Sequence, residues 1–154
     1  MRFHIITIFP NSFDSYINES IVGRAIKNKF IDVKFYNPRD FIKGPKVNQN
    51  NYRPVDDRPY GGGPGMVIRA EPMLKAIEKS LSKIKDKKKI KIILFSPSGK
   101  KFVTTYEKQA VKKYSDIILI CGRYEGIDAR VKKIFKAEYI SIGDYVLTGG
   151  ELPA

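Results

Sequence analysis

Apolar runs and helical segments alternate along this chain of 154 residues. Runs that are rich in β-branched residues and short enough to be strands lie at 3–8, 31–36, 90–95, 117–121 and 137–142, with a shorter apolar piece at 66–68. Between them, apolar spacing and turn residues predict helices at 12–17, 22–29, 71–83, 104–113 and 127–135. Strands that alternate with helices form parallel sheets, because a parallel connection needs a crossover. We therefore predict one α/β domain whose mostly parallel sheet is flanked by helices.

Three glycine-containing loops follow apolar runs in this pattern. They are SPSGK at 96–100, CGRYEG at 121–126 and the end of YISIGDYVLTGGELP at 139–153. Gly143, Gly149 and Gly150 can adopt positive φ or let a ligand approach the backbone closely, which larger residues cannot do cheaply. Open α/β sheets bind their ligands in crevices at the ends of strands. We expect the three loops to form one site for a flat, polar molecule.

The charge balance favours a polyanionic partner without requiring one. The chain has 29 Lys and Arg residues against 16 Asp and Glu residues, a formal net charge of +13. Such an excess attracts a phosphate backbone. However, the lysines are concentrated between Lys75 and Lys101, and an isoleucine- and lysine-rich background produces the same bias without any binding function. Charge alone leaves both interpretations open.

Several common sites are excluded by what the sequence lacks. No G-x-G-x-x-G turn follows the first predicted strand, which excludes the dinucleotide-binding fingerprint. Leu94 and Lys101 occupy the positions where a Walker A motif needs Gly and Ser or Thr. His4 is the single histidine and lies inside a predicted strand, so a histidine-based triad and a multi-histidine zinc site are excluded.

Cysteine usage and the apolar runs indicate where the protein resides. Cys121 is the single cysteine and ends an apolar run, so we predict a buried structural thiol. No apolar run reaches the roughly 20 residues that span a bilayer, and the first residues lack the apolar stretch of a signal peptide. We expect no membrane association and a cytoplasmic location.

Three longer blocks carry a specific resemblance. DDRPYGGGPGM at 56–66, CGRYEGID at 121–128 and SIGDYVLTGGELP at 141–153, together with IFPNSF and NPRDF, resemble the signature blocks of bacterial tRNA (guanine-N1)-methyltransferases, the TrmD family of the SPOUT class. The resemblance covers essentially the whole chain. It implies a sheet that ends in a deep trefoil knot, which binds S-adenosylmethionine in a bent form. Periodicity does not imply a knot, since true knots are very rare.

The resemblance also implies which residues bind the cofactor, and they fall in the three loops. They are Phe95, Ser96, Pro97, Gly122, Tyr124, Glu125, Gly126, Ile142, Gly143, Asp144, Tyr145, Val146, Leu147, Gly149, Gly150 and Pro153. Glu125 has two interpretations: it faces the sulfonium or the amino group of the cofactor, or it is a surface carboxylate paired with Arg123 or Arg130. We expect Glu125 and Arg123 to support catalysis.

The long polar stretch at 37–65 is interpreted as facing the substrate, because a stretch of this length without periodicity is usually functional or disordered. Its candidate substrate-binding residues are Asp56, Asp57, Arg58, Tyr60 and Gly61. A carboxylate can accept hydrogen bonds from the N1 and N2 hydrogens of guanine. The alternative is that the two aspartates form turn hydrogen bonds, the common fate of aspartate in such loops.

The activity that the resemblance implies is methyl transfer from S-adenosylmethionine to N1 of the guanosine at position 37, on the 3′ side of a tRNA anticodon. In the family the general-base aspartate, an accompanying arginine and a helical tRNA-binding domain lie beyond the position of Ala154. We therefore expect residues 1–154 to be the cofactor-binding domain, with little or no activity alone. The resemblance also implies a homodimer and suggests a use of Mg²⁺. The alternatives are a non-catalytic cofactor-binding module and a nonspecific RNA-binding module.

Overall fold

The computed structural model describes residues 1–42 and 53–154 and contains a parallel sheet in the order β2-β1-β6-β5-β7. Its strands are β1 (Arg2–Ile6), β2 (Asp32–Tyr36), β5 (Ile90–Lys101), β6 (Asp116–Ile120) and β7 (Glu138–Ser141). All four neighbouring pairs are parallel. A separate antiparallel pair consists of β3 (Asp56–Asp57) and β4 (Val67–Ile68). The predicted α/β class with a mostly parallel sheet is confirmed.

The five helices that the apolar spacing predicts are present, with small differences at their ends. The helices of the structure are η1 (Pro10–Phe13), α1 (Asp14–Ile17), α2 (Ser20–Lys27), η2 (Pro38–Phe41), α3 (Ala70–Leu81), η3 (Lys87–Lys89), α4 (Thr104–Lys113) and α5 (Ala129–Phe135). The short helices η2 and η3 were not predicted. The helix predicted at 104–113 has the predicted bounds. The helix predicted from 127 begins later, because the side chain of Asp128 caps it by accepting from Arg130 N at 2.9 Å.

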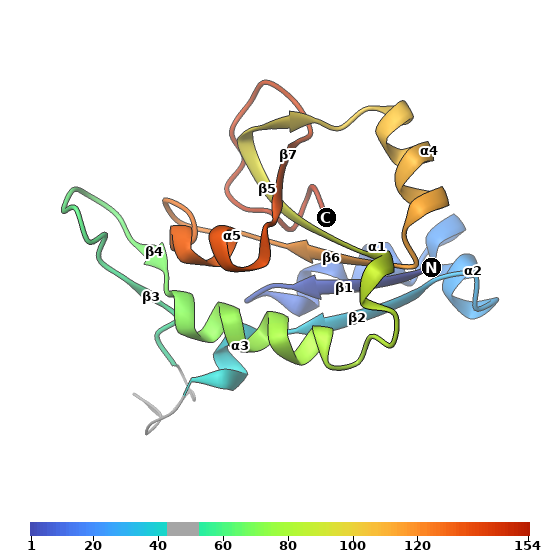
Figure 1. Cartoon of the computed structure of the whole chain (residues 1–154), viewed down its shortest axis with the longest axis horizontal. Helices are drawn as coiled ribbons and strands as arrows, with labels where there is room; N and C mark the ends of the chain where they lie inside the picture. The colour runs from blue at the N-terminus through green and yellow to red at the C-terminus, as the bar shows by residue number, and fades with distance from the viewer. Residues whose placement is uncertain (43–52) are drawn as a thin grey trace.

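Two apolar clusters cover the two faces of the sheet. On one face, Met73 and Ile77 of α3 and Val131 of α5 pack with Ile118 and Ile120 of β6. On the other face, residues from η1, α1 and α4 pack against the alternate side chains of the strands: Phe13, Ile17 and Tyr106 with Ile5, Ile117 and Leu119. In Figure 1, α3 runs below the strands and α4 stands above them. β6 is buried throughout, as a central strand covered on both faces must be.

The segment predicted as the loop SPSGK is part of a long, irregular strand. β5 continues to Lys101, and both Phe95 and Lys100 are registered against Ile140 of β7, so the residues between them bulge from the ladder. A Cβ on Gly99 would lie 2.5 Å from the backbone N of Ile140. The absent side chain at Gly99 therefore lets the chain return to β7, and the prediction that β5 ends at residue 95 was wrong.

The long polar stretch has more structure than its sequence predicts. It contains η2 and β3, while residues 43–52 of this stretch lie outside the described residues. Cys121 is buried as predicted, and burial raises the pKa of its thiol well above the usual value. Within the described ranges, no helix is both long and apolar enough to cross a bilayer.

Candidate functional site

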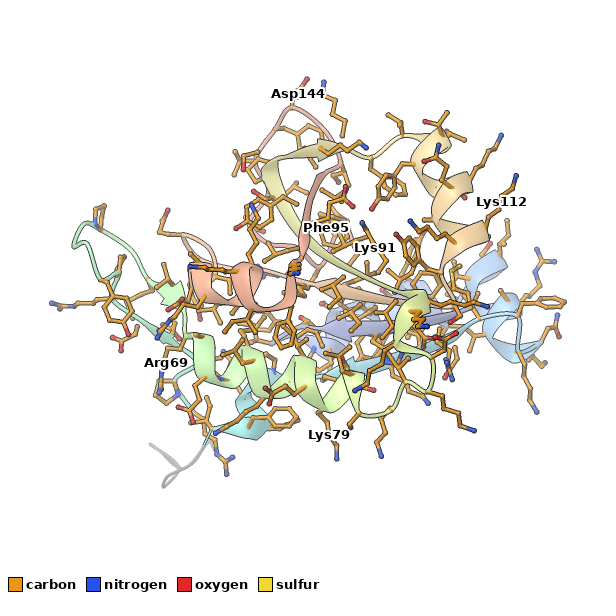
Figure 2. The ribbon with its side chains drawn as sticks, viewed as in Figure 1. Arg69, Lys79, Lys91, Phe95, Lys112 and Asp144 are labelled. Carbon is orange, nitrogen blue, oxygen red and sulfur yellow. The ribbon has the colours of Figure 1, made fainter. Side chains whose placement is uncertain are left out.

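A cavity of about 460 Å³ lies where β5, β6 and β7 lead into the three glycine-containing segments. The residues predicted to bind a cofactor all line it, except Asp144: they are Phe95, Ser96, Pro97, Gly122, Tyr124, Glu125, Gly126, Ile142, Gly143, Tyr145, Val146, Leu147, Gly149, Gly150 and Pro153. The carboxylate of Asp144 instead accepts from Lys101 Nζ at 2.5 Å, and Asp144 lies at the outer tip of its loop (Figure 2). The structure thus brings the three predicted segments together around one hollow.

Backbone contacts between glycines join two of these segments. Gly150 N donates to Gly122 O at 2.9 Å. A Cβ on Gly150 would lie 2.7 Å from Cys121 Cα and 2.9 Å from Gly122 N, closer than real Cβ atoms approach other atoms. Because these neighbours are backbone atoms, they cannot rotate away. Gly150 is therefore required for the close packing of the C-terminal segment against the end of β6.

A polar strut, which we define as Thr7, Arg123 and Glu151, holds the same segment; Thr7 and Glu151 are buried and Arg123 is partly exposed. Glu151 Oε1 accepts from Thr7 Oγ1 and Glu151 Oε2 from Arg123 Nε, each at 2.8 Å. Arg123 also donates to Thr148 O at 3.4 Å, and its guanidinium lies over the ring of Phe9 at 4.9 Å. Thr7 and Glu151 are absent from the predicted site. The available signal was an acidic residue, Glu151, inside the GGELP block.

The loop at 142–147 is shaped by a short local network. Ser141 Oγ donates to Gly143 O at 2.8 Å and accepts from Gly143 N at 3.2 Å. A Cβ on Gly143 would lie 2.2 Å from the ring of Tyr145, so this glycine lets the ring fold back over the loop. The loop consequently presents backbone groups and apolar side chains to the cavity, a combination suited to the edge and faces of a flat base.

Glu125 lines the cavity, and neither predicted ion pair forms. Arg123 pairs with Glu151, and Arg130 pairs with Asp128 at 2.7 Å. Hydrogen bonds from Arg130 lower the pKa of Asp128 below its usual value. Glu125 N donates to Met66 O at 3.0 Å, and a Cβ on Gly65 would lie 2.5 Å from Glu125 Cγ. The interpretation of Glu125 as a carboxylate paired with Arg123 or Arg130 was wrong.

The candidate substrate-binding residues lie outside the cavity lining, on the segment that leads to Gly65. Asp57 Oδ1 accepts from Arg58 N at 2.8 Å, which is the turn role that the sequence left open. Tyr60 is 90% exposed, and its hydroxyl accepts from Arg130 Nη2 at 3.3 Å. A Cβ on Gly61 would meet no other atom within 4 Å.

Backbone hydrogen bonds connect this exposed segment to the cavity. Ile68 N donates to Gly126 O at 2.9 Å, and Asp128 N donates to Ile68 O at 3.0 Å. Asp56 is paired with Ile68 in the short β3–β4 ladder. The candidate substrate segment therefore begins and ends next to the loop that carries Glu125. As for metals, residues 1–42 and 53–154 contain no group of three or more His, Cys, Asp or Glu side chains that could hold an ion.

Comparisons with known proteins agree over the whole chain. The family model described as tRNA (Guanine-1)-methyltransferase TrmD matches residues 1–154. A tRNA (guanine-N(1)-)-methyltransferase of Buchnera aphidicola is 47% identical over 99% of this chain and 60% of its own length. One of Clostridioides difficile is 46% identical over 100% of this chain and 63% of its own length.

A solved structure is similar to this protein in both fold and sequence. The crystal structure of tRNA (m1G37) methyltransferase from Aquifex aeolicus matches with a TM-score of 0.79 and 37% identity, over 99% of this chain and 64% of that one. The chain thus spans about 60% of the length of the curated relatives that it matches. It belongs to the TrmD family of tRNA (guanine-1)-methyltransferases.

Proposed function

We propose that this chain is the S-adenosylmethionine-binding part of a cytoplasmic enzyme that methylates N1 of guanosine 37, on the 3′ side of a tRNA anticodon. The observation that supports this most directly is that three segments separate in sequence line one cavity of about 460 Å³, roughly the volume that small-ligand sites have. The substrate in this proposal, a guanine of tRNA, is taken from the names of the relatives. Because the chain spans only part of those relatives, the methylation activity is proposed for the whole protein.

The residues around the cavity fit this cofactor. The backbone of 142–147 would bind the edge of the adenine, while the side chains of Pro97, Ile142 and Leu147 would contact its faces. Glu125 would place a negative charge beside the sulfonium or the amino group. When bound, the cofactor supplies an electrophilic methyl group. The protein's task is then to hold the guanine N1 in line with that methyl and to remove the N1 proton, and such positioning contributes on the order of 7–11 kcal/mol.

Calorimetric titration of this chain with S-adenosylmethionine, paired with single-turnover methylation of an unmodified tRNA carrying guanosine 37, tests the proposal. We expect one cofactor molecule bound per chain and little methylation, because the resemblance assigns the proton-abstracting aspartate to a later part of the protein. Absence of binding would contradict the cofactor site. Fast methylation by this chain would show instead that residues 1–154 suffice for catalysis.

Glu125→Gln should separate the two groups that the carboxylate can face. If Glu125 faces the sulfonium, the variant binds S-adenosylmethionine about tenfold more weakly, the equivalent of one charge-assisted hydrogen bond of about 1.4 kcal/mol. S-adenosylhomocysteine has no sulfonium, so its Kd should change by less than about twofold. Glu78→Gln, on the exposed face of α3, is the matched control. Equal weakening of both ligands would place Glu125 at the amino group, and no change in either would exclude it from the site.

We propose that the C-terminal segment forms the trefoil knot that the family resemblance implies. Two contacts support this topology. Phe102 N donates to Ser141 O at 2.7 Å, which places the end of β7 beside the end of β5. Gly150, nine residues later, contacts the end of β6 through Gly122. A crystal structure that traces 90–154 without a threaded segment would contradict the knot.

We also propose a homodimer in which the segment at 56–65 serves the partner's cofactor site. The exposed ring of Tyr60 and the open space around Gly61, Gly62 and Gly63 support this role, since the segment leaves much of its surface uncovered by its own chain. The implied use of Mg²⁺ and the implied C-terminal tRNA-binding domain remain predictions. Molar mass in solution, measured by light scattering, checks the dimer: a monomer at high concentration would contradict it.

A further inference from the structure

Eleven lysines gather at the amino ends of β5 and β6, on a surface that we call the lysine-rich edge. It consists of three segments: 83–91 with six lysines, 112–115 with two, and 132–136 with three. The whole chain has 29 Lys and Arg residues, so more than a third of its cations lie on these short segments. In Figure 2, Lys112 points away from the body of the protein on the last turn of α4.

Contacts between the three segments show that they meet in space. Ser115 N donates to Lys89 O at 2.9 Å, which joins the second segment to the first. Lys91 forms an ion pair with Glu138, two residues after the third segment. The ammonium groups of Lys91 and Lys113 lie 5.7 Å and 5.5 Å from the centre of the Tyr114 ring. The three segments therefore meet at one edge of the sheet, although their lysines come from several helices and loops.

A hollow of about 300 Å³ lies in this edge. Lys87, Lys91 and Lys136 line it together with Tyr114, and its remaining lining is apolar: Leu81, Ile90, Ile92 and Phe135. Cationic groups together with apolar side chains and an aromatic ring suit a phosphate that is attached to a flat or sugar-like group. A simple solvated lysine face would need no such hollow.

Three carboxylates, Asp86, Asp116 and Glu138, lie in or within two residues of the three segments, against eleven lysines, so the edge keeps a net positive charge. Asp86 Oδ1 accepts from Lys88 N at 3.0 Å as the cap of η3. Asp116 binds Arg2, and Glu138 binds Lys91 and Tyr106. Among the described residues, Lys91 is the one lysine of the edge that forms an ion pair within 4.0 Å. The other lysines of the edge remain available to an external anion.

The position of the edge indicates the size of its ligand. The distance between the two ends of the sheet is set by the length of β6, which has five residues. At roughly 3.3 Å per residue this distance is about 17 Å. The cofactor cavity lies at the opposite, carboxyl ends of these strands. A single nucleotide is too short to occupy both places, whereas a polynucleotide spans them.

We propose that the lysine-rich edge binds the phosphate backbone of RNA and gives the tRNA substrate a second point of attachment, away from the cofactor cavity. This rests on the proposed function for its substrate. The hollow and the Tyr114 ring favour RNA over an anionic membrane, because a flat lipid surface would not use a lined hollow. The contribution is electrostatic and independent of base sequence.

The test compares two triple variants with the same change in net charge. Lys87→Ala, Lys88→Ala and Lys136→Ala together remove cations of the edge. Arg24→Ala, Lys27→Ala and Lys29→Ala together remove exposed cations in and after α2, beside β2, from which β1 and β6 separate β5. Binding of a fluorescein-labelled anticodon stem-loop RNA is followed by fluorescence anisotropy over a series of salt concentrations. Calorimetry with S-adenosylhomocysteine measures the cofactor site of each variant independently.

We expect the edge variant to bind the RNA about tenfold more weakly and its slope of log K against log salt to flatten by about 2, the loss of up to three phosphate contacts. The α2 variant should change the affinity by less than about twofold, with the slope retained. Both should bind S-adenosylhomocysteine as the unmodified chain does.

Equal weakening of RNA binding by both triple variants, or no RNA binding by the unmodified chain, would overturn the proposal. So would edge-dependent binding to phosphatidylserine vesicles with RNA binding unchanged. Failure of S-adenosylhomocysteine binding in the unmodified chain would overturn the proposed function and leave the RNA result to be judged separately.

Discussion

Gly150→Ala is expected to weaken S-adenosylmethionine binding by about 10- to 100-fold, because over-packing a closely packed site costs about 1–3 kcal/mol. The new methyl group would lie 2.7 Å from Cys121 Cα and 2.9 Å from Gly122 N. Relief requires the C-terminal segment to move away from the end of β6, which breaks the hydrogen bond from Gly150 N to Gly122 O. Calorimetric titration of the variant gives the change in Kd.

Gly61→Ala is the matched control for this substitution. Its added Cβ would meet no atom within 4 Å, and Gly61 does not have positive φ, so cofactor affinity and the thermal midpoint should both stay near the unmodified values. If Gly150→Ala bound the cofactor as well as Gly61→Ala does, the C-terminal segment would not form a wall of the site. Circular dichroism of both variants separates a local change at the cavity from general unfolding.

Asp116→Asn is expected to lower the free energy of unfolding by about 3 kcal/mol, the low end of the range for a broken buried ion pair. Asp116 is fully buried and accepts from Arg2 Nε at 2.7 Å, His4 Nε2 at 3.0 Å and Ser115 Oγ at 2.8 Å. The cost stays at the low end because the side chain of Arg2 is 40% exposed and remains partly hydrated. Urea unfolding at pH 7 measures the effect. Asp32→Asn, which breaks an exposed pair with Lys34, should cost less than about 0.5 kcal/mol.

Titration of the same carboxylate should make the free energy of unfolding depend on pH. Burial raises the pKa of Asp116, but hydrogen bonds from Arg2, His4 and Ser115 outweigh burial and lower it from 3.8 to about 2. A carboxylate whose pKa is lower in the folded state stabilises the protein above its unfolded pKa, and this contribution is lost as the pH falls through the folded pKa. The unmodified protein should therefore lose stability between about pH 4 and pH 2 more steeply than Asp116→Asn. Parallel pH curves for the two proteins would contradict the assignment.

The sequence predicted the parts of the fold that depend on local pattern. Apolar spacing sufficed for α4, whose bounds match, because helix formation depends on residues three and four positions apart. The irregular half of β5 was missed, because its return to β7 depends on the contact between Gly99 and Ile140, 41 residues away. His4 was predicted to lie inside the first strand. It lies in β1 as predicted, but its hydrogen bond reaches Asp116, 112 residues away.

The candidate site was also predicted only in part: its motifs were found, but its long-range contacts were not. Motif resemblance named residues that line one cavity, although their role in binding the cofactor is a prediction that awaits titration. It did not name Thr7, because a threonine at the end of a strand carries no local signal for a partner such as Glu151. Nor did it find that Asp144 turns outward to Lys101, which depends on the irregular end of β5.

The strut of Thr7, Arg123 and Glu151 has a consequence for the order in which the protein assembles. Thr7 and Glu151 are 144 residues apart. Closing a loop of this length costs conformational entropy before the contact contributes any stability. During synthesis the first strand leaves the ribosome long before residue 151 exists, so Thr7, which directly follows β1, has no such partner until then. We therefore expect the C-terminal wall of the cavity, which Glu151 anchors, to be fixed late in folding.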